Sequence, residues 1–246
     1  MSIPKKITVF LLLAIILALM GMVLLRNYHS AMRGPKEAQK MEIVKYFPFS
    51  QENALKEWEE KIFKGKVIYR IEKNQTLDYV RATSNKTASA LYYRIKLDAK
   101  QRYPVTSWKW NVNKFPQKKG RESIETENED DFAARVYVIF PAFFFTNSKV
   151  LEYIWAETLP EGMIGTSPYS KNIKLIVAKS GQNNEKKWFS QDRDIINDYM
   201  KAFGTKPEYD IGAVAFMTNA EHTGTSADAM YDDIKLGYRE ETKEIK

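Results

Sequence analysis

ENEDDFAARVYVIF, residues 127–140, is the stretch that decides the fold. With a period of two, one face of a strand carries only apolar side chains: Phe132, Ala134, Val136, Val138 and Phe140. The other face carries a carboxylate, a guanidinium and a phenol, from Asp131, Arg135 and Tyr137. The apolar face predicts a core. The polar face predicts either the floor of a ligand groove or an internal brace of the sheet.

Strand-like segments continue on both sides of this stretch and are mostly bounded by Gly, Pro, Asn, Asp or Lys-rich turns. They read VKYFPF, KVIYRIE, LDYVRATS, SALYYRIKLD, VTSWKWNV, ARVYVIF, EYIWAET, NIKLIVAKSG, IGAVAFMT and DDIKLGY. Helical patterns occupy only residues 50–63 and 191–204. Many short strands without alternating long helices predict an all-β fold, a jelly-roll-like antiparallel β-sandwich with one or two short helices.

An apolar segment precedes the predicted sandwich. Residues 7–25, ITVFLLLAIILALMGMVLL, form an uncharged run of 19 residues, long enough for a single transmembrane helix. Lys5 and Lys6 favour a cytoplasmic N-terminus, which puts the rest of the chain outside. The run is longer than the apolar part of a signal peptide and lacks a small-x-small site after it, so we expect an uncleaved anchor in the lipid bilayer.

The expected organisation has five parts. These are a cytoplasmic tail at 1–6, the anchor at 7–25, a juxtamembrane linker at 26–43, the sandwich at 44–238 and a charged tail at 239–246.

The composition excludes several classes of function. The chain has no cysteine and only two histidines, which rules out thiol catalysis, thiolate metal sites and a zinc site built on clustered imidazoles. Residues 1–40 hold six basic and one acidic side chain, so they supply +5 of the net charge of +7. The predicted domain is therefore nearly balanced, and no nucleic-acid partner is expected.

Aromatic residues on two strands are candidates for ligand contacts. Trp108 and Trp110 share one strand face, and we expect the core to take at least one of them. In LEYIWAET, Tyr153, Trp155 and Glu157 alternate with Ile154 and Ala156. If the aliphatic pair points inward, Trp155 lies on an outer face near Asp131 and Arg135. Aromatic rings beside fixed charges suit a polyhydroxylated ligand, whereas surface salt bridges and aromatics covering a sheet are the alternative.

The C-terminal part adds a polar loop and a buried carboxylate. Glu221 and His222 lie in TNAEHTG, between two strands, and could form a ligand-contacting rim. In YDDIKL the alternation turns Asp232 toward the core, where it needs backbone amides, an arginine or a structural calcium ion as partner. Apart from that ion, no cofactor is predicted.

Several of these segments together resemble a bacterial envelope family, the domain of unknown function 3047 (DUF3047). They are the W-x-W strand at 108–110, DDFAARVYVIF at 130–140, YIWA at 153–156, NDYMKAFG at 197–204 and the Thr-Gly loop before YDDI. This chain has TNAEHTG where family members usually carry an Asp-rich loop. The resemblance implies a sandwich like galactose-binding or carbohydrate-binding modules, and a place in the inner membrane with the C-terminal domain in the periplasm or outside. It assigns no activity.

We therefore predict a non-enzymatic, membrane-anchored binder of a saccharide or another polar envelope ligand, with no catalytic residue. The predicted ligand-binding residues are Asp131, Arg135, Tyr137, Trp155, Glu221 and His222. One alternative is a glycan hydrolase that uses two carboxylates among Asp131, Glu157, Glu221 and Asp233. The other is a structural or protein-binding module, in which Asp131 and Arg135 form an ion pair that fixes the sheet.

Overall fold

The computed structural model describes residues 41–51, 53–73 and 77–240. The predicted anchor at 7–25 lies outside this range, as do the predicted cytoplasmic tail and most of the linker. Among the residues that the structure describes, no helix has the length and apolar character needed to span a bilayer.

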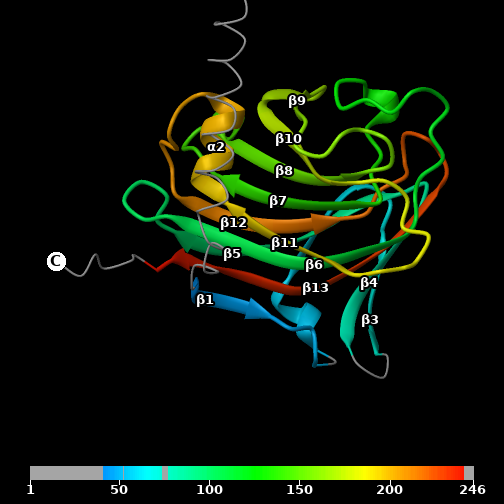
Figure 1. The fold of residues 1–246 in the computed structure, drawn as a ribbon, viewed down its shortest axis with the longest axis horizontal. Helices are drawn as coiled ribbons and strands as arrows, with labels where there is room; N and C mark the ends of the chain where they lie inside the picture. Colours follow the sequence, from blue (N-terminus) through cyan, green and yellow to red (C-terminus); the bar gives the residue numbers. More distant parts are fainter. Residues whose placement is uncertain (1–40, 52, 74–76, 241–246) are drawn as a thin grey trace, which may run out of the picture. The chain divides into compact units, whose positions relative to one another are not determined.

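Two β-sheets face each other and form a sandwich, as the sequence predicts (Figure 1). The first sheet has six strands in the order β11-β6-β13-β4-β3, and β1 also pairs with β13. Their bounds are β1 Met41–Phe47, β3 Ile68–Lys73, β4 Asp78–Asn85, β6 Pro104–Lys114, β11 Phe189–Asp194 and β13 Ser226–Arg239. The second sheet has seven strands in the order β2-β5-β12-β7-β8-β10-β9. Their bounds are β2 Glu59–Lys64, β5 Ala88–Leu97, β7 Ala134–Phe140, β8 Lys149–Ala156, β9 Ile164–Ser167, β10 Ser170–Ser180 and β12 Ile211–Met217.

Pairing is antiparallel throughout the described strands except between β8 and β10, which run parallel. β13 is long enough to pair with β4 along its first half and with β1 along its second half. The β1 pairing sets Met41 opposite Arg239. The described domain therefore begins and ends side by side.

One α-helix is present in the described part of the chain, α2 at Ile195–Phe203. Asp194 caps its start by accepting a hydrogen bond from the Asn197 amide, and Gly204 ends it with a φ of 76°. The helix predicted at residues 50–63 is wrong. That segment is a short 3-10 turn, Ala54–Glu57, followed by β2, because pairing with β5 overrides the local helical pattern. Two further 3-10 turns occupy Glu127–Glu129 and Phe145–Asn147.

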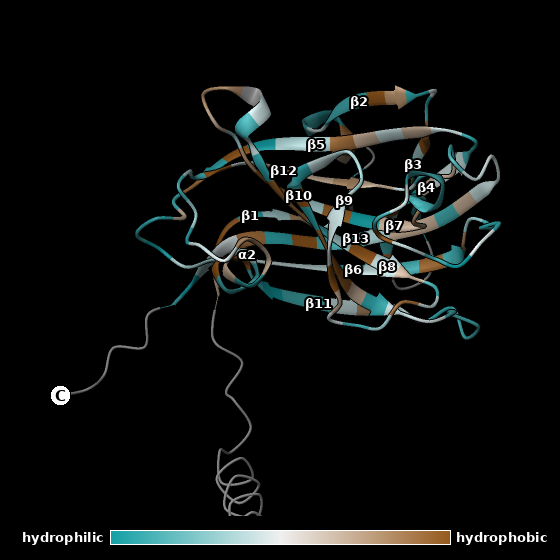
Figure 2. Cartoon of the chain, turned by 90° about the horizontal axis from the view of Figure 1, so that it is seen from above, coloured by the Kyte–Doolittle hydropathy of each residue, from teal (hydrophilic) through white to brown (hydrophobic). Residues whose placement is uncertain are grey.

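The core fills the space between the sheets, and hydropathy alternates along the strands that enclose it (Figure 2). On β7 the apolar face from Ala134 to Phe140 points into this core, as predicted. Trp108 and Trp110 are both fully buried there. Phe132 precedes the strand and joins a second cluster with Ile124 and Ile154 instead, so its predicted place on the β7 core face is wrong.

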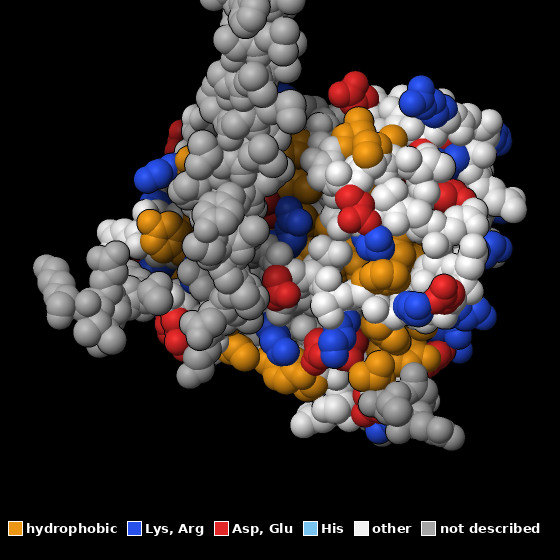
Figure 3. All heavy atoms as spheres, in the orientation of Figure 1, with side chains coloured by type: hydrophobic (Ala, Val, Ile, Leu, Met, Phe, Trp, Pro, Cys, Tyr) orange, Lys and Arg blue, Asp and Glu red, His pale blue; other side chains and the backbone are white. Residues whose placement is uncertain are grey.

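The sandwich has two unlike ends (Figure 1). We call the end where β1 begins and β13 stops the proximal end, because it carries the first described residue, Met41; the loops 98–103 and 141–148 lie there beside α2. At the distal end the loops 115–133, 157–163, 181–188 and 218–225 come together. On the face seen in Figure 3, basic and acidic side chains are interspersed, in agreement with the nearly balanced charge expected for the domain.

Candidate functional site

Arg135 is an internal brace at the distal end of the second sheet. Its side chain is only 2% exposed, and its Nε donates to Asn219 Oδ1 at 2.8 Å. Its two terminal nitrogens form ion pairs with Glu152 on β8 and with Asp130, the latter at 3.3 Å. The guanidinium also stacks over the Phe132 ring, 4.9 Å from the centroid. One cation thus holds β7, β8 and two loops together.

Burial and mutual attraction shape the ionisation of this network. Burial alone would lower the pKa of Arg135, but the charges of Asp130 and Glu152 raise it well above its ordinary value. Burial raises the pKa of Glu152 to about 7, although Arg135 opposes the shift. Burial likewise raises the pKa of Asp130. Arg135 therefore stays charged because two acids face it, while burial makes Glu152 and Asp130 harder to ionise.

Asp131 is fully buried and does not pair with Arg135. One of its oxygens accepts hydrogen bonds from Asn219 Nδ2 at 2.8 Å and from the His222 amide at 3.3 Å. The other accepts the Thr223 amide at 2.6 Å. The predicted Asp131–Arg135 ion pair is therefore wrong, because Asp130, one residue earlier, takes that place. Asp131 holds the 218–225 loop.

Glu221 and His222 form the partly exposed edge of the same cluster. His222 Nε2 lies 3.2 Å from Glu221 Oε1 and 2.7 Å from the Tyr169 hydroxyl. Burial, and next the charge of Asp131, raise the pKa of Glu221 to about 7. One donor atom from each of Asp131, Glu221 and His222 lies within 4.8 Å of the others, so this group could hold a cation.

Trp155 lies on the opposite face of the sheet from Arg135, which corrects the predicted site. The β7–β8 register sets Trp155 opposite Ala134, and Ile154 opposite Arg135. The indole is 1% exposed and packs 5.7 Å from Trp110, centroid to centroid, in the inter-sheet core. Its Nε1 donates to the Gly181 carbonyl at 2.9 Å. Trp155 therefore holds the start of the 181–188 loop from within the core.

Tyr137 shares the Arg135 face, as predicted, and stands opposite Glu152 across the strand pair. Its side chain is partly exposed. Of the predicted ligand-binding residues, the structure thus gathers Asp131, Arg135, Glu221 and His222 around Asn219, with Tyr137 next to them and Trp155 apart.

Asp232 is buried on β13 at 3% exposure, but its predicted place on the core side is wrong. The register sets Tyr231 opposite the core residue Trp110 and Asp232 opposite Lys109, on the other face of the sheet, because a register shift after Asp232 breaks the alternation that leads to Ile234. Asp232 Oδ1 has no hydrogen-bond partner within the described part of the chain. Burial raises its pKa to about 6. Asp233 turns outward with a φ of 51° and pairs with Lys109 at 2.6 Å. A calcium ion at Asp232 stays a prediction.

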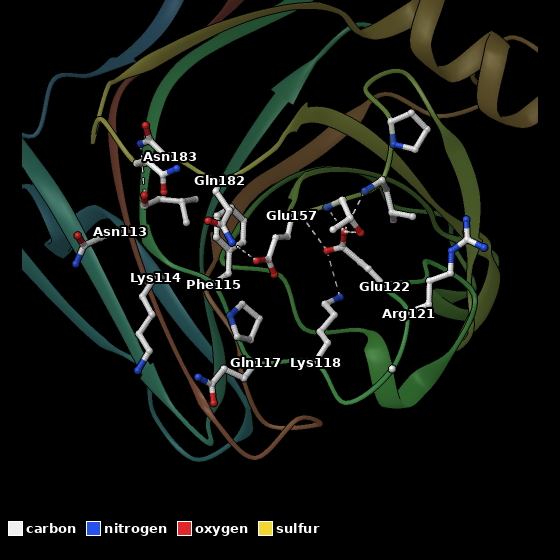
Figure 4. Close-up of a pocket in the computed structure, with 17 residues that line it drawn as sticks. Asn113, Lys114, Phe115, Gln117, Lys118, Arg121, Glu122, Glu157, Gln182 and Asn183 are labelled. Carbon is white, nitrogen blue, oxygen red and sulfur yellow. Dashed lines mark hydrogen bonds and ion pairs between the residues drawn. The ribbon is translucent and has the colours of Figure 1, made fainter.

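A groove of about 850 Å³ opens at the distal end between three loops. Its lining comes from residues 112–118, 120–122, 157–160 and 182–184. Four exposed side-chain amides line it, from Asn113, Gln117, Gln182 and Asn184, together with two exposed cations, Lys114 and Arg121. Phe115 adds a partly exposed aromatic ring. In Figure 4, Gln182 and Glu157 approach each other beside Phe115, and the Gln182 amide donates to the Glu157 carboxylate at 2.8 Å.

The groove walls are held by groups behind them. Glu122 accepts hydrogen bonds from the amides of Glu157, Thr158 and Leu159 at 3.1, 2.6 and 3.1 Å, which fixes the 157–163 loop (Figure 4). The Lys118 ammonium lies 3.5 Å from Glu122. Burial acts to raise the pKa of Glu122, yet Lys118 and these amides hold it below its ordinary value. Glu122 is therefore a fixed anion that shapes the groove.

Sequence reasoning missed this groove. Its amides come from NVNKFPQKKGR and SGQNNEKK, two polar loops about 70 positions apart in the chain. The clustering of Asn and Gln in both loops was the available signal, but nothing in the sequence shows that the loops are neighbours.

A family model described as a protein of unknown function (DUF3047) matches residues 56–235. The chain belongs to this family. The resemblance seen in the sequence is thereby confirmed, and the DUF3047 match covers the sandwich from the end of the first 3-10 turn into β13. The search of curated proteins gave no match.

Solved structures similar to this DUF3047 domain are remote. The family 11 carbohydrate-binding module of the cellulosomal cellulase Lic26A-Cel5E of Clostridium thermocellum is 11% identical, with a TM-score of 0.42 over 82% of this chain and 96% of that chain. TmCBM27, a carbohydrate-binding module with specific mannan recognition, is 7% identical, with a TM-score of 0.40 over 82% and 99%. The xyloglucanase domain of NopAA from Sinorhizobium fredii, in complex with cellobiose, is 10% identical, with a TM-score of 0.41 over 74% and 92%. At these TM-scores the likeness carries no argument about function.

Proposed function

We propose that this DUF3047 domain is a non-enzymatic binder of a saccharide or another polyhydroxylated ligand, and that the ligand lies in the distal groove. The observation that carries the proposal is the groove of about 850 Å³ with its four exposed side-chain amides and one aromatic ring. The volume falls within the range of about 300–1,000 Å³ that small-molecule sites occupy.

The groove chemistry suits neighbouring hydroxyl groups. Each side-chain amide offers both a donor and an acceptor, as a sugar hydroxyl does, so an amide pairs with a hydroxyl in either direction. Glu157 adds a charged acceptor, and the exposed side chains of Lys114 and Arg121 add charged donors; hydrogen bonds to charged groups are the stronger ones. Phe115 offers an apolar face to the C–H side of a sugar ring.

Contacts within the protein fix the groove walls. Glu122 fixes one wall through three backbone amides, and Trp155 supports the 181–188 loop through Gly181. Binding therefore needs little ordering of the protein, which favours affinity. The partly exposed cluster of Glu221, His222 and Tyr169 at the same end of the sandwich is a second place for polar contacts with a longer ligand.

The carboxylates favour binding over hydrolysis. Asp131 is fully buried, and both of its oxygens accept backbone amides. Asp233 belongs to the first sheet and is held by Lys109 and Tyr46. In the groove, Glu122 is occupied by the 157–163 loop. Glu157 is thus left without a second free carboxylate among the groove residues, whereas glycoside hydrolysis requires two.

The location is proposed from the sequence. The apolar run at 7–25 supports a single-pass inner-membrane anchor, with the domain on the periplasmic or outer side. A structural role in an envelope complex is the alternative, and the internal position of Arg135 suits either one.

The test is a panel of soluble envelope and plant-type oligosaccharides, added to the full chain in detergent and followed by calorimetry. We expect at least one saccharide to bind, and Gln182→Ala to weaken that binding. Gln101→Ala is the matched control, because Gln101 is an exposed glutamine at the proximal end. Equal weakening by both variants, or no binding by any saccharide, contradicts the proposal.

A further inference from the structure

Two phenylalanines stand exposed at the tip of the 141–148 loop, between β7 and β8. Phe143 is 92% exposed and Phe144 is 67% exposed. Their rings contact each other edge to face at 5.1 Å between centroids. Large aromatic side chains this exposed, and adjacent, are uncommon on a soluble surface and mark an interaction site.

This loop belongs to the proximal end, where the described chain begins. Pro141 packs against Gly212, where an added Cβ would come within 2.4 Å of the Pro141 ring. Two hydrogen bonds connect this region to the 98–103 loop and to β13. The Ala99 amide donates to Asp210, two residues before Gly212, at 3.3 Å, and the Asp98 amide donates to the Tyr238 hydroxyl at 2.8 Å.

Tyr238 in turn neighbours Arg239, the residue opposite Met41. Tyr103, 55% exposed, lies at the same end, where its carbonyl accepts the Arg239 amide. The exposed aromatic side chains and the start of the domain therefore share one end of the sandwich.

A basic hollow of about 560 Å³ adjoins the phenylalanine loop. Pro141 and Gly212 belong to its lining, so it shares a wall with the loop. Three cationic side chains line it, from Arg94, Lys96 and Lys100. Glu59 binds Arg94 at 3.1 Å and Asp210 lies 3.9 Å from Lys100, so two carboxylates offset part of this charge and leave one positive charge in excess. The hollow is therefore suited to an anionic group such as a phosphate monoester or diester.

We propose that the proximal end of the sandwich docks on an anionic phospholipid surface. Phe143 and Phe144 enter the boundary between headgroups and acyl chains, and the basic hollow faces a headgroup phosphate. Aromatic side chains favour this boundary, and cations near it are attracted by anionic lipids.

The segment that precedes the described domain favours a lipid surface as the occupant. Residues 26–40 link Met41 to the apolar run at 7–25, and fifteen residues span at most roughly 50 Å. A bilayer that holds this run would thus lie within reach of the end that carries the aromatic residues. The tether alone leaves the domain free to turn, and the phenylalanines and the basic hollow select one orientation.

The test uses the full chain in vesicles of phosphatidylcholine with and without phosphatidylglycerol. Because the chain has no cysteine, one introduced cysteine gives a single fluorophore site. Thr146→Cys places the fluorophore beside the phenylalanines, and Glu185→Cys places it on an exposed distal loop. With a spin-labelled lipid as quencher, we expect quenching about threefold greater at position 146 than at position 185 in vesicles with phosphatidylglycerol.

Two sets of variants test the phenylalanine pair and the basic hollow separately. Phe143→Ser with Phe144→Ser is expected to reduce the quenching at position 146 to the level at 185, while residues 7–25 are unchanged in every variant. Lys96→Gln with Lys100→Gln is expected to remove the added effect of phosphatidylglycerol. Equal quenching at both positions in the parent chain overturns docking of this end.

Free phosphate and protein partners are distinguished in the same experiment. If inorganic phosphate without vesicles changes the fluorescence at position 146 as much as vesicles do, the hollow binds a soluble anion and the lipid assignment is wrong. If the phenylalanine variants quench like the parent chain, the loop serves another partner and the proposal also fails. Saccharide binding in the distal groove is measured separately, so it can stand or fall independently.

Discussion

The two ends of this sandwich depart from the usual distribution of side chains in opposite directions. The distal end buries charge, since Arg135, Asp130, Asp131 and Glu152 are each less than 10% exposed. The proximal end exposes apolar rings, those of Phe143 and Phe144. Charged residues are seldom buried without partners, and large exposed apolar patches are seldom without a function.

The difference separates groups that hold the fold from groups that are free to act outward. At the distal end each buried charge has its partners inside the domain, so the loops are fixed and a groove can persist between them. At the proximal end the phenylalanine rings mainly touch each other, so little of the fold depends on them. Substitutions at the two ends should therefore differ in kind as well as in size.

The largest effect is expected from Arg135→Ala. It leaves Glu152 and Asp130 buried without their cation, which costs about 3–5 kcal/mol of the free energy of unfolding. Urea denaturation measures the loss. Glu42→Gln is the control at the proximal end, because it breaks an exposed ion pair with Arg102 and should cost less than about 1 kcal/mol. Similar losses of the free energy of unfolding in both variants would show that the buried network contributes no more to stability than an exposed ion pair.

Glu221→Gln tests the partly buried carboxylate at the edge of this cluster by the pH dependence of stability. The pKa of Glu221 is raised from 4.5 to about 7, so the folded protein holds this proton more tightly than the unfolded chain does. The stabilising contribution is complete below pH 4.5 and is lost as the pH rises through about 7. Glutamine stays neutral at both pH values. The free energy of unfolding of the variant should therefore exceed that of the parent by about 1–3 kcal/mol at pH 8.5 and differ little from it at pH 4.5. Urea denaturation at the two pH values would disprove this if the difference did not grow with pH.

Gln182→Ala sharpens the comparison at the groove. The variant removes one exposed amide and its contact with Glu157, so saccharide affinity should fall about fivefold to tenfold, which corresponds to about 1–1.4 kcal/mol. Calorimetry measures the change, with Gln101→Ala as the proximal control. The free energy of unfolding should be the same in both variants, and a loss of stability specific to Gln182→Ala would assign this residue to the fold.

The smallest effect on stability is expected from replacing both exposed phenylalanines. Phe143→Ser with Phe144→Ser should change the free energy of unfolding by less than about 0.5 kcal/mol, because water already surrounds both rings. Phe140→Ala, at the buried end of β7, should cost about 3–5 kcal/mol. Thermal and urea unfolding of the two variants compare these costs. A large loss for the serine pair would mean that the loop supports the fold.

The sequence predicts much of the sandwich because alternation on β7 has one fully apolar face. It fails on β8, where both faces are buried and both therefore carry apolar residues. A period of two then gives no sign of which face meets the other sheet, and Trp155 was placed on the wrong one. Asp232 is buried, but the strand pattern assigns it to the wrong face, because alternation cannot show the register shift between Asp232 and Lys235.

The candidate site was harder to predict because its parts come from distant segments. Arg135 had three neighbouring acids in the sequence, and only the folded loop shows that Asp130 pairs with it while Asp131 turns to the 218–225 loop. Glu152 joins them through the register of β7 and β8. The groove amides require two loops to meet, which depends on the strand order of both sheets.

The pairing of Met41 with Arg239 also determines how the domain carries mechanical load. If the chain is pulled at Met41 while a ligand is held at the distal end, the force runs along β1 and β13. The hydrogen bonds between antiparallel strands are perpendicular to that direction, so they are loaded together in shear. A pull between Met41 and Arg239 would instead open the same bonds one after another, like a zipper. The β1–β13 pairing thus resists tension along its strands, and it yields when Met41 and Arg239 are drawn apart.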